Sequence, residues 1–399
     1  MFSIVAYILL PFIAALIAAV WAFPKILRIA LIKNIVDNPD ARKLQRVPVP
    51  VLGGMVVMAG ILVALCVADL LVDCNSLYTV VLAMAIMLFI GTMDDILDIP
   101  STTRFILEIL VALMIIYTCD YSLDNLHGLW GVNELSPWVS IPLTIVTVVG
   151  VINAINLIDG VDGYSSGYCV MACGMFGTFF YLVGDMPMTM LAIVCMASLI
   201  PFFLHNVFGR KSKMFIGDGG TLLMGCVMSV FVLNILKSTT ECETYCSLGL
   251  GLVPFTLAVL CVPVFDTVRV MTMRILRKTS PFHADKTHLH HLFIEMGFSH
   301  IGTTASILTL NCLVVLGWWI SYQCGASIDV QLYVVVALSL LVTVGFYYGM
   351  RFSGKKNLKI YRLMQRLGKK THVGRRGFFL WLQHLVDRDF DAQDINEQK

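Results

Sequence analysis

The sequence predicts an all-α polytopic membrane protein with about eleven transmembrane helices. Of its 399 residues, 58% are hydrophobic and only 14% are charged, and the mean hydropathy is +0.83. A water-soluble domain needs a more polar surface, so that class is excluded. The net charge of +2 does not point to nucleic acid as a partner. In a membrane chain, what matters is the side on which each Lys and Arg lies.

Eleven apolar windows of about 20 residues predict the spans. They lie at residues 3–23, 51–72, 76–93, 103–119, 140–158, 166–184, 188–206, 218–236, 248–268, 304–321 and 331–349. The first window lacks a positive region before it and is followed by Pro24 and Lys25 rather than a cleavage site. We therefore expect a retained span there and not a signal peptide. Pro263 within the ninth window predicts a kink in that span.

The basic residues predict the orientation. All but one of the 28 Lys and Arg fall in alternate segments, at 24–50, 94–104, 207–217, 269–303 and after 350, the exception being Lys237. The positive-inside rule then puts the N-terminus outside, the C-terminus in the cytoplasm and residues 159–165 on the cytoplasmic side.

The sequence therefore predicts two parts: a transmembrane domain at 1–350 and a basic cytoplasmic tail at 351–399. In the tail, basic residues alternate with Leu, Ile, Tyr and Phe. It is either an amphipathic helix on anionic headgroups or a solvated anchor.

Polar residues gather at the predicted cytoplasmic ends of the spans. Asp94 and Asp95 leave the third span side by side, where they repel each other unless a cation or a shared proton relieves them. Taken in isolation, this pair is better explained by a solvated helix end than by a site.

Asn153 to Gly163 is more informative. On a helix continuing from the fifth span, Asn153, Asn156 and Asp159 share one face, and Asp162 follows. Such groups can hold a hard cation, or a sugar and a base by hydrogen bonds. Capping alone needs fewer polar groups, so a functional role is favoured.

Two more motifs lie on the same side. Asp218, in the glycine-rich stretch before the eighth span, is either an N-cap or a carboxylate that brings Mg²⁺ to a phosphate. Residues 280–291 hold four His without any Cys, which disfavours a zinc site. Nearby basic residues favour an anion-binding loop instead; they are Arg274, Arg277, Lys278 and Lys286.

Together these motifs resemble those of the polyprenyl-phosphate N-acetylhexosamine-1-phosphate transferase family over nearly the whole chain. They are the acidic pair at 94–95, Asn-x-x-Asn-x-x-Asp-Gly-x-Asp-Gly at 153–163, Phe-x-Gly-Asp-x-Gly-Thr at 215–221, His-x-His-His at 288–291 and Pro-x-x-Gly-Gly at 50–54. Leu289 interrupts the His motif, as in the bacterial enzymes that put GlcNAc 1-phosphate on undecaprenyl phosphate. The branch that uses UDP-MurNAc-pentapeptide shows three consecutive His.

The resemblance implies transfer of GlcNAc 1-phosphate from UDP-GlcNAc to undecaprenyl phosphate, with release of UMP and a need for Mg²⁺, for which Mn²⁺ can substitute. It implies Asp218 as a metal ligand, with Asn156 or Asp159 beside it. The implied catalytic residues are Asp94, Asp95, Asp159, His290 and His291. The implied substrate contacts are Asn153, Asn156, Asp162, Lys43 and His288.

The sequence leaves several alternatives open. The lipid phosphate attacks directly, or an aspartyl-phosphate forms first. The rival functions are the phospho-N-acetylmuramoyl-pentapeptide transferase of peptidoglycan synthesis, a secondary transporter and, more weakly, a zinc hydrolase. We further expect a bacterial inner membrane, bilayer lipid as a partner, the first membrane step of a cell-envelope polysaccharide, and a homodimer.

Overall fold

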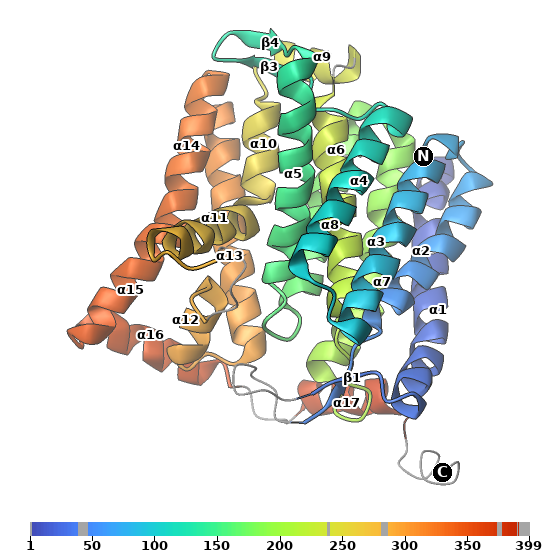
Figure 1. Ribbon diagram of the computed structural model, residues 1–399, viewed down its shortest axis with the longest axis vertical. Coiled ribbons are helices and arrows are strands. Elements are labelled where there is room, and N and C mark those ends of the chain that lie inside the picture. Colours follow the sequence, from blue (N-terminus) through green and yellow to red (C-terminus); the bar gives the residue numbers. More distant parts are fainter. Residues whose placement is uncertain are drawn as a thin grey trace.

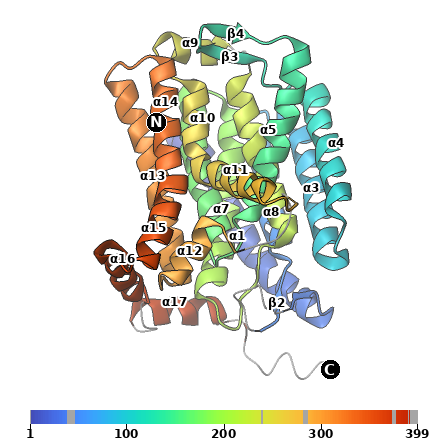
Figure 2. The same cartoon turned by 60° about the vertical axis from the view of Figure 1, so that its left-hand side comes forward.

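The computed structural model describes residues 2–38, 47–237, 240–280, 286–372, 377–388 and 390. Long helices run side by side through most of the molecule (Figures 1 and 2). They are α1 (Phe2–Ile32), α2 (Gly53–Asp69), α3 (Tyr78–Leu97), α4 (Ser101–Cys119), α5 (Pro137–Leu157), α6 (Tyr164–Val183), α7 (Met186–Phe208), α8 (Gly217–Leu236), α10 (Leu252–Val259) followed by α11 (Cys261–Leu276), α13 (His300–Gln323) and α14 (Ile328–Leu340) continued by η2 (Leu341–Gly345) and α15 (Phe346–Lys355). A helix therefore occupies each of the eleven apolar windows.

The span lengths confirm the all-α membrane class. Among the described residues, nine helices are long and apolar enough to cross a bilayer, and the bent pair α10–α11 counts as a tenth. The remaining window contains α2, which has 17 residues. Eleven crossings and their orientation therefore stay predictions.

Short elements cover the two ends of the bundle. At the upper end in Figure 1 lie η1 (Asn75–Leu77), α9 (Thr240–Ser247) and the hairpin of β3 (Asn125–Leu129) with β4 (Val132–Glu134). At the lower end lie β1 (Val36–Asp37) paired with β2 (Val49–Pro50), α12 (Leu289–Glu295), α16 (Lys359–Lys370) and α17 (Phe378–Asp387). The tail thus contains helices, as the predicted amphipathic helix on anionic headgroups requires.

Helix α8 lies at the centre of the bundle, since 94% of its apolar window is buried. It packs directly against α3 and α5. A Cβ on Gly91 of α3 would lie 2.4 Å from the backbone carbonyl oxygen of Asp218, so only glycine permits this approach. Backbone contact at this point brings the end of α3, with its acidic pair, to the start of α8.

The ninth span is broken, as Pro263 predicts, but the break falls three residues earlier, at Leu260. Helices α10 and α11 meet there at 75°. Asn311 of α13 stabilises the break, because its side-chain amide donates to the carbonyls of Ala258 and Val259 while its Oδ1 accepts from the Val262 amide. Pro263 lies in the first turn of α11, where no intrahelical N–H is needed. In both views, α11 crosses the direction of the other helices (Figures 1 and 2).

Candidate active site

Four helices bring polar side chains together at the lower end of the bundle. They are the last turns of α3 and α5 and the first turns of α4 and α8. The end of α3 and the start of α8 are more than 100 residues apart in the sequence. We call the group formed by Asp94, Asp95, Arg104, Glu108, Asn153, Asn156 and Asp218 the acidic cluster.

Asp95 serves as the cap of α8. Its carboxylate accepts hydrogen bonds from the backbone amides of Asp218, at 3.0 Å, and Gly219, at 3.2 Å. The first amides of a helix have no partner within it and attract a negative charge. Asp218 is therefore not the N-cap, and its own carboxylate is left to face the cluster.

The Pro-x-x-Gly-Gly motif holds the same helix start from the other side. The amide of Phe215 donates to the carbonyl of Pro50 at 2.7 Å, and the amides of Gly53 and Gly54 donate to the carbonyls of Phe215 and Ile216. These hydrogen bonds pin the turn before α8, so this motif positions Asp218 through the backbone.

Arg104 is the centre of the acidic cluster, and the sequence analysis missed it. Its Nη1 donates to Asp94 at 2.9 Å and to Asp218 at 3.2 Å. Its Nη2 donates to the side-chain oxygens of Asn153, at 3.2 Å, and Asn156, at 3.5 Å. Four oxygens from three other helices thus surround one guanidinium group.

Glu108, one turn after Arg104, was missed as well. It is fully buried, lies 3.4 Å from Nε of Arg104 and accepts a 2.5 Å hydrogen bond from the amide of Asn153. The signal was present in the sequence, because ionisable residues four apart share a helix face and are rare within a membrane span.

Asn156 joins the amide motif to the glycine-rich motif. Its amide donates to Asp218 Oδ1 at 2.9 Å and to the hydroxyl of Thr221 at 2.8 Å. This contact orients one oxygen of Asp218, while the side chain stays 37% exposed. Asn156 and Asp218, two of the predicted metal ligands, are therefore adjacent.

The prediction that the fifth span continues to Asp159 is wrong. Helix α5 ends at Leu157, and Gly160 and Gly163 lie in the turns that follow. Asp159 is consequently not on the face of Asn153 and Asn156; it is exposed, and it accepts a hydrogen bond from the hydroxyl of Ser165 in α6. Glycine lets the chain turn back towards α6 at once, which a continuing helix would prevent.

Asp162, in the loop after α5, contacts two basic side chains that are not part of the acidic cluster. Its Oδ2 lies 2.6 Å from Nζ of Lys213 and 2.8 Å from Nδ1 of His300. Burial alone would raise the pKa of Asp162, but the hydrogen bond and charge of His300 and the ammonium of Lys213 outweigh it and lower that pKa. Asp162 is thus held as a carboxylate, and neither partner was foreseen from the sequence.

Asp266, on the crossing helix α11, holds the His motif. One of its oxygens lies 3.0 Å from Nδ1 of His288 and accepts the amide of Leu289, and the other lies 2.6 Å from Arg269. The side chains of Asp266 and Arg269 are each only 3% exposed. The Nε2 of His288 is buried and has no hydrogen-bond partner among the described residues. A bound ligand can satisfy this nitrogen.

His290 joins the His motif to the loop after α5. It packs so closely on Gly160 that a Cβ there would lie 2.3 Å from its Nε2. Burial lowers the pKa of His290 well below its ordinary value, so the ring is neutral and acts as a hydrogen-bonding group. His291 is partly exposed, with its ring centroid 4.3 Å from that of His290. Leu289 points into the core.

Two predicted contributors lie outside the described residues. They are Lys43, in the first loop, and His283, in the loop before the His motif. Neither is placed relative to the acidic cluster.

The donor set of the acidic cluster suits a hard cation such as Mg²⁺, which prefers carboxylate and amide oxygens. Three carboxylates, those of Asp94, Glu108 and Asp218, face a single guanidinium, so the acidic groups outnumber the one basic group. Arg104 bridges Asp94 and Asp218. Within the described residues, no three acidic, His or Cys side chains form a preorganised metal site. Metal binding would therefore require the guanidinium to shift.

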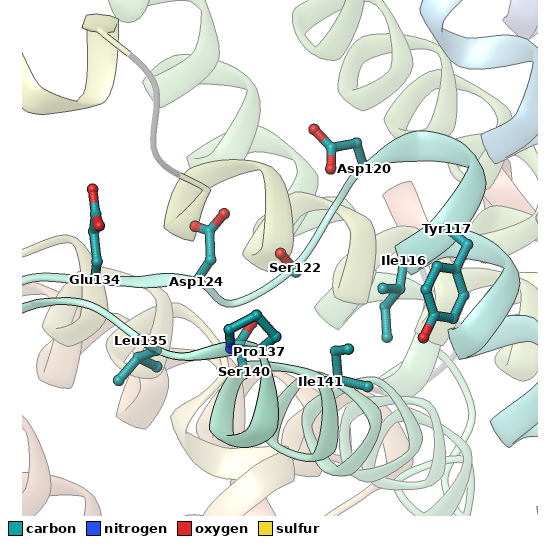
Figure 3. Close-up of a pocket in the computed structure, with 10 residues that line it drawn as sticks. All are labelled: Ile116, Tyr117, Asp120, Ser122, Asp124, Glu134, Leu135, Pro137, Ser140 and Ile141. Atoms are coloured by element: carbon teal, nitrogen blue, oxygen red, sulfur yellow. The ribbon is translucent and has the colours of Figure 1, made fainter.

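A pocket of about 410 Å³ lies at the opposite end of the bundle, below the hairpin. Asp120, Asp124 and Glu134 line it, but Figure 3 shows their carboxylates standing apart from one another. Asp120 pairs with Lys237 instead. This pocket is separate from the acidic cluster.

Known proteins match this chain over most of its length. Residues 77–236, which include the acidic cluster, match the model described as glycosyl transferase family 4. The undecaprenyl-phosphate alpha-N-acetylglucosaminyl 1-phosphate transferase of Salmonella typhi is 28% identical over 88% of this chain and 91% of that protein. The enzyme of the same name from Escherichia coli K12 is 29% identical over 86% and 90%.

A Gram-positive relative shows the same likeness. The probable undecaprenyl-phosphate N-acetylglucosaminyl 1-phosphate transferase of Bacillus subtilis is 27% identical over 73% of this chain and 79% of that protein. With its motifs in order, the chain is similar to undecaprenyl-phosphate N-acetylglucosaminyl 1-phosphate transferases over most of its length, and its residues 77–236 match glycosyl transferase family 4.

Proposed function

We propose that the protein transfers GlcNAc 1-phosphate from UDP-GlcNAc to undecaprenyl phosphate, giving UMP and undecaprenyl-diphosphate-GlcNAc. The observation that carries this proposal is the convergence of Asp94, Asn156 and Asp218 around Arg104 at one end of a membrane bundle. Asp95 caps α8 beside them. The names of the relatives supply the donor sugar and the acceptor. We also propose that this end faces the cytoplasm of a bacterial inner membrane.

Asp218 and Asn156 are the proposed Mg²⁺ ligands, with Asp94 beside them. Bound there, Mg²⁺ would neutralise the diphosphate of the donor and stabilise the departing UMP. We assign Asp95 to positioning, because its carboxylate already caps α8. Asp94 is then the member of the pair that can orient the lipid phosphate.

Asp162 and the His motif are the proposed contacts to the donor. The neutral ring of His290 can donate its one N–H to a phosphate oxygen. With Nδ1 of His288 facing Asp266, the unpartnered Nε2 of His288 can accept a hydroxyl proton of the donor, or donate to a phosphate oxygen when the ring carries a second proton. Asp266 fixes the ring of His288 for this task.

The crossing helix α11 offers the acceptor a path from the bilayer. Its outer side exposes Val268, Ile275 and Leu276, while Asp266 and Arg269 on its inner side hold the His motif. An isoprenoid chain can therefore lie along the apolar side and present its phosphate to the cluster. The 75° break at Leu260 turns α11 across the bundle, because a straight span would keep α11 parallel to its neighbours.

The two rival functions are less well supported. The pentapeptide branch has a His at the position of Leu289, and here that residue is a buried core side chain. The relatives named above all carry GlcNAc in their names. A transporter site is expected near the middle of the membrane, whereas the acidic cluster lies at helix ends.

The test is to incubate the purified protein with radiolabelled UDP-GlcNAc, undecaprenyl phosphate and Mg²⁺. We expect a labelled lipid and an equal amount of UMP. UDP-MurNAc-pentapeptide in a parallel reaction should give neither. No labelled lipid from UDP-GlcNAc would refute the proposal, and product from the pentapeptide alone would assign the rival enzyme. Mass photometry of the same preparation tests the predicted homodimer.

A further inference from the structure

We propose that the C-terminal helices α16 and α17 form a strap that positions Asp162 through its two partners, Lys213 and His300. This inference rests on the proposed function, in which Asp162 contacts the donor nucleotide sugar. It adds that residues more than 200 positions later in the chain set the affinity for that donor.

The partners of Asp162 need support from elsewhere. Lys213 and His300 are 30% and 38% exposed, and exposed ion pairs hold their geometry poorly because mobile side chains must be ordered. Lys213 lies in the loop between α7 and α8, and His300 is the first residue of α13. Whatever fixes those two backbone segments fixes the carboxylate between them.

One end of the strap fixes the segment that carries His300. The hydroxyl oxygen of Thr371, just after α16, accepts the amide of Ser299 at 2.9 Å, and the hydroxyl of Ser299 donates to the carbonyl of Thr371 at 2.8 Å. Ser299 is the N-cap of α13, and His300 is the first residue of that helix. Gly302 lies directly against the Thr371 side chain, so α13 and the strap are in close contact here.

The other end of the strap fixes the segment that carries Lys213. At the end of α17, the carboxylate of Asp387 accepts the backbone amides of Arg210, Lys211 and Ser212 at 3.0 to 3.2 Å. It also accepts the hydroxyl of Ser212 at 2.8 Å. Three successive amides directed at one carboxylate define the path of this loop up to the residue before Lys213.

Aromatic packing seats the same end of the strap on the bundle. Phe379 of α17 lies 5.6 Å from Phe208, ring centroid to centroid. Phe390 lies at 6.1 Å from His205, whose Nδ1 is in turn 2.9 Å from the hydroxyl of Ser212. The strap therefore reaches Asp162 by two routes. One runs through Thr371 and Ser299 to His300, and the other runs through Asp387 and the loop at 210–212 to Lys213.

The test uses one conservative variant at each end, Asp387→Asn and Thr371→Val, in the full-length enzyme. Each removes hydrogen-bond acceptors or donors without changing the size of the side chain. We expect the KM for UDP-GlcNAc to rise about threefold to tenfold in each variant with kcat largely retained. Thr371→Ser keeps the hydroxyl and should restore the KM. Lys370→Ala, an exposed neighbour of Thr371, is the control.

A double-mutant cycle identifies the route of the effect. If the strap acts through Asp162, Asp387→Asn should add no further rise in KM when Asp162→Asn is already present. Additive effects, or an unchanged KM in both single variants, would overturn the strap. Fewer active molecules with an unchanged KM would also overturn it, because that is the result of a purely structural role. An inactive wild-type enzyme would instead refute the proposed function.

Discussion

The two ends of the bundle carry the same kinds of acidic residue in different surroundings. At the lower end, Asp94 and Asp218 share the guanidinium of Arg104. The backbone amide of Ile99, just after α3, orients Asp94, and the side-chain amide of Asn156 in α5 orients Asp218. At the upper end, Asp120 is 90% exposed and has Lys237 as a flexible partner. A carboxylate is therefore a candidate for a functional site when other polar side chains converge on it and shield it from solvent. An exposed ion pair contributes little to stability and does not indicate a site.

The largest expected effect is the loss of activity in Asp218→Ala. We expect transfer of labelled GlcNAc 1-phosphate to fall at least about 100-fold, because the variant lacks a proposed ligand of the Mg²⁺ that would neutralise the diphosphate. The matched variant at the other end, Asp120→Asn, should leave the rate unchanged. Equal losses in both variants would break the contrast between the two ends.

Metal removal should follow the same division. We expect EDTA to abolish transfer by the wild-type protein and added Mg²⁺ or Mn²⁺ to restore it. Titration calorimetry should show weaker Mg²⁺ binding by Asp218→Ala, and unaltered binding by Asp120→Asn. Full activity in excess EDTA would remove Mg²⁺ from the proposed reaction.

Asp266→Asn tests the buried ion pair beneath the His motif. Breaking a pair that is only 3% exposed leaves Arg269 without its charged partner and should cost about 3 to 5 kcal/mol of unfolding free energy. The thermal midpoint of the detergent-solubilised protein measures this loss. Asp120→Asn also removes a carboxylate from an ion pair, yet its midpoint should stay that of the wild type. Similar midpoints for both variants would contradict the importance of burial.

The smallest expected effect concerns the outer surface of α16. Ile360, Leu363 and Leu367 are exposed beside Arg362, Arg366 and Lys370, which favours contact with anionic headgroups. An environment-sensitive fluorophore on Leu363→Cys, in a cysteine-depleted background, should shift to the blue in phosphatidylglycerol nanodiscs relative to phosphatidylcholine ones. The same label on Glu134→Cys, at the upper end, should not respond. An identical response at both sites would leave the tail as a solvated anchor.

Sequence patterns predicted the helices better than the contacts between them. Each apolar window contains a helix, because hydropathy is a property of one segment and needs no knowledge of its neighbours. The error at Asp159 arose from the turn, since two glycines ended the helix that the spacing argument continued. Arg104 was counted as a loop charge, although its guanidinium lies at the centre of the acidic cluster.

By itself, the sequence determined the membrane class of the protein and the motifs that it shares with similar transferases. Only the tertiary structure decided what each polar side chain does. Asp95 and Asp94 are neighbours in the chain, yet one caps α8 and the other faces Arg104. Thr371 and Asp387 belong to a tail without a motif, yet they reach the two segments that flank Asp162. The physical reason is that a side-chain hydrogen bond depends on how each helix is rotated about its axis and where it lies along its neighbours. Both are set by the packing contacts of the whole bundle.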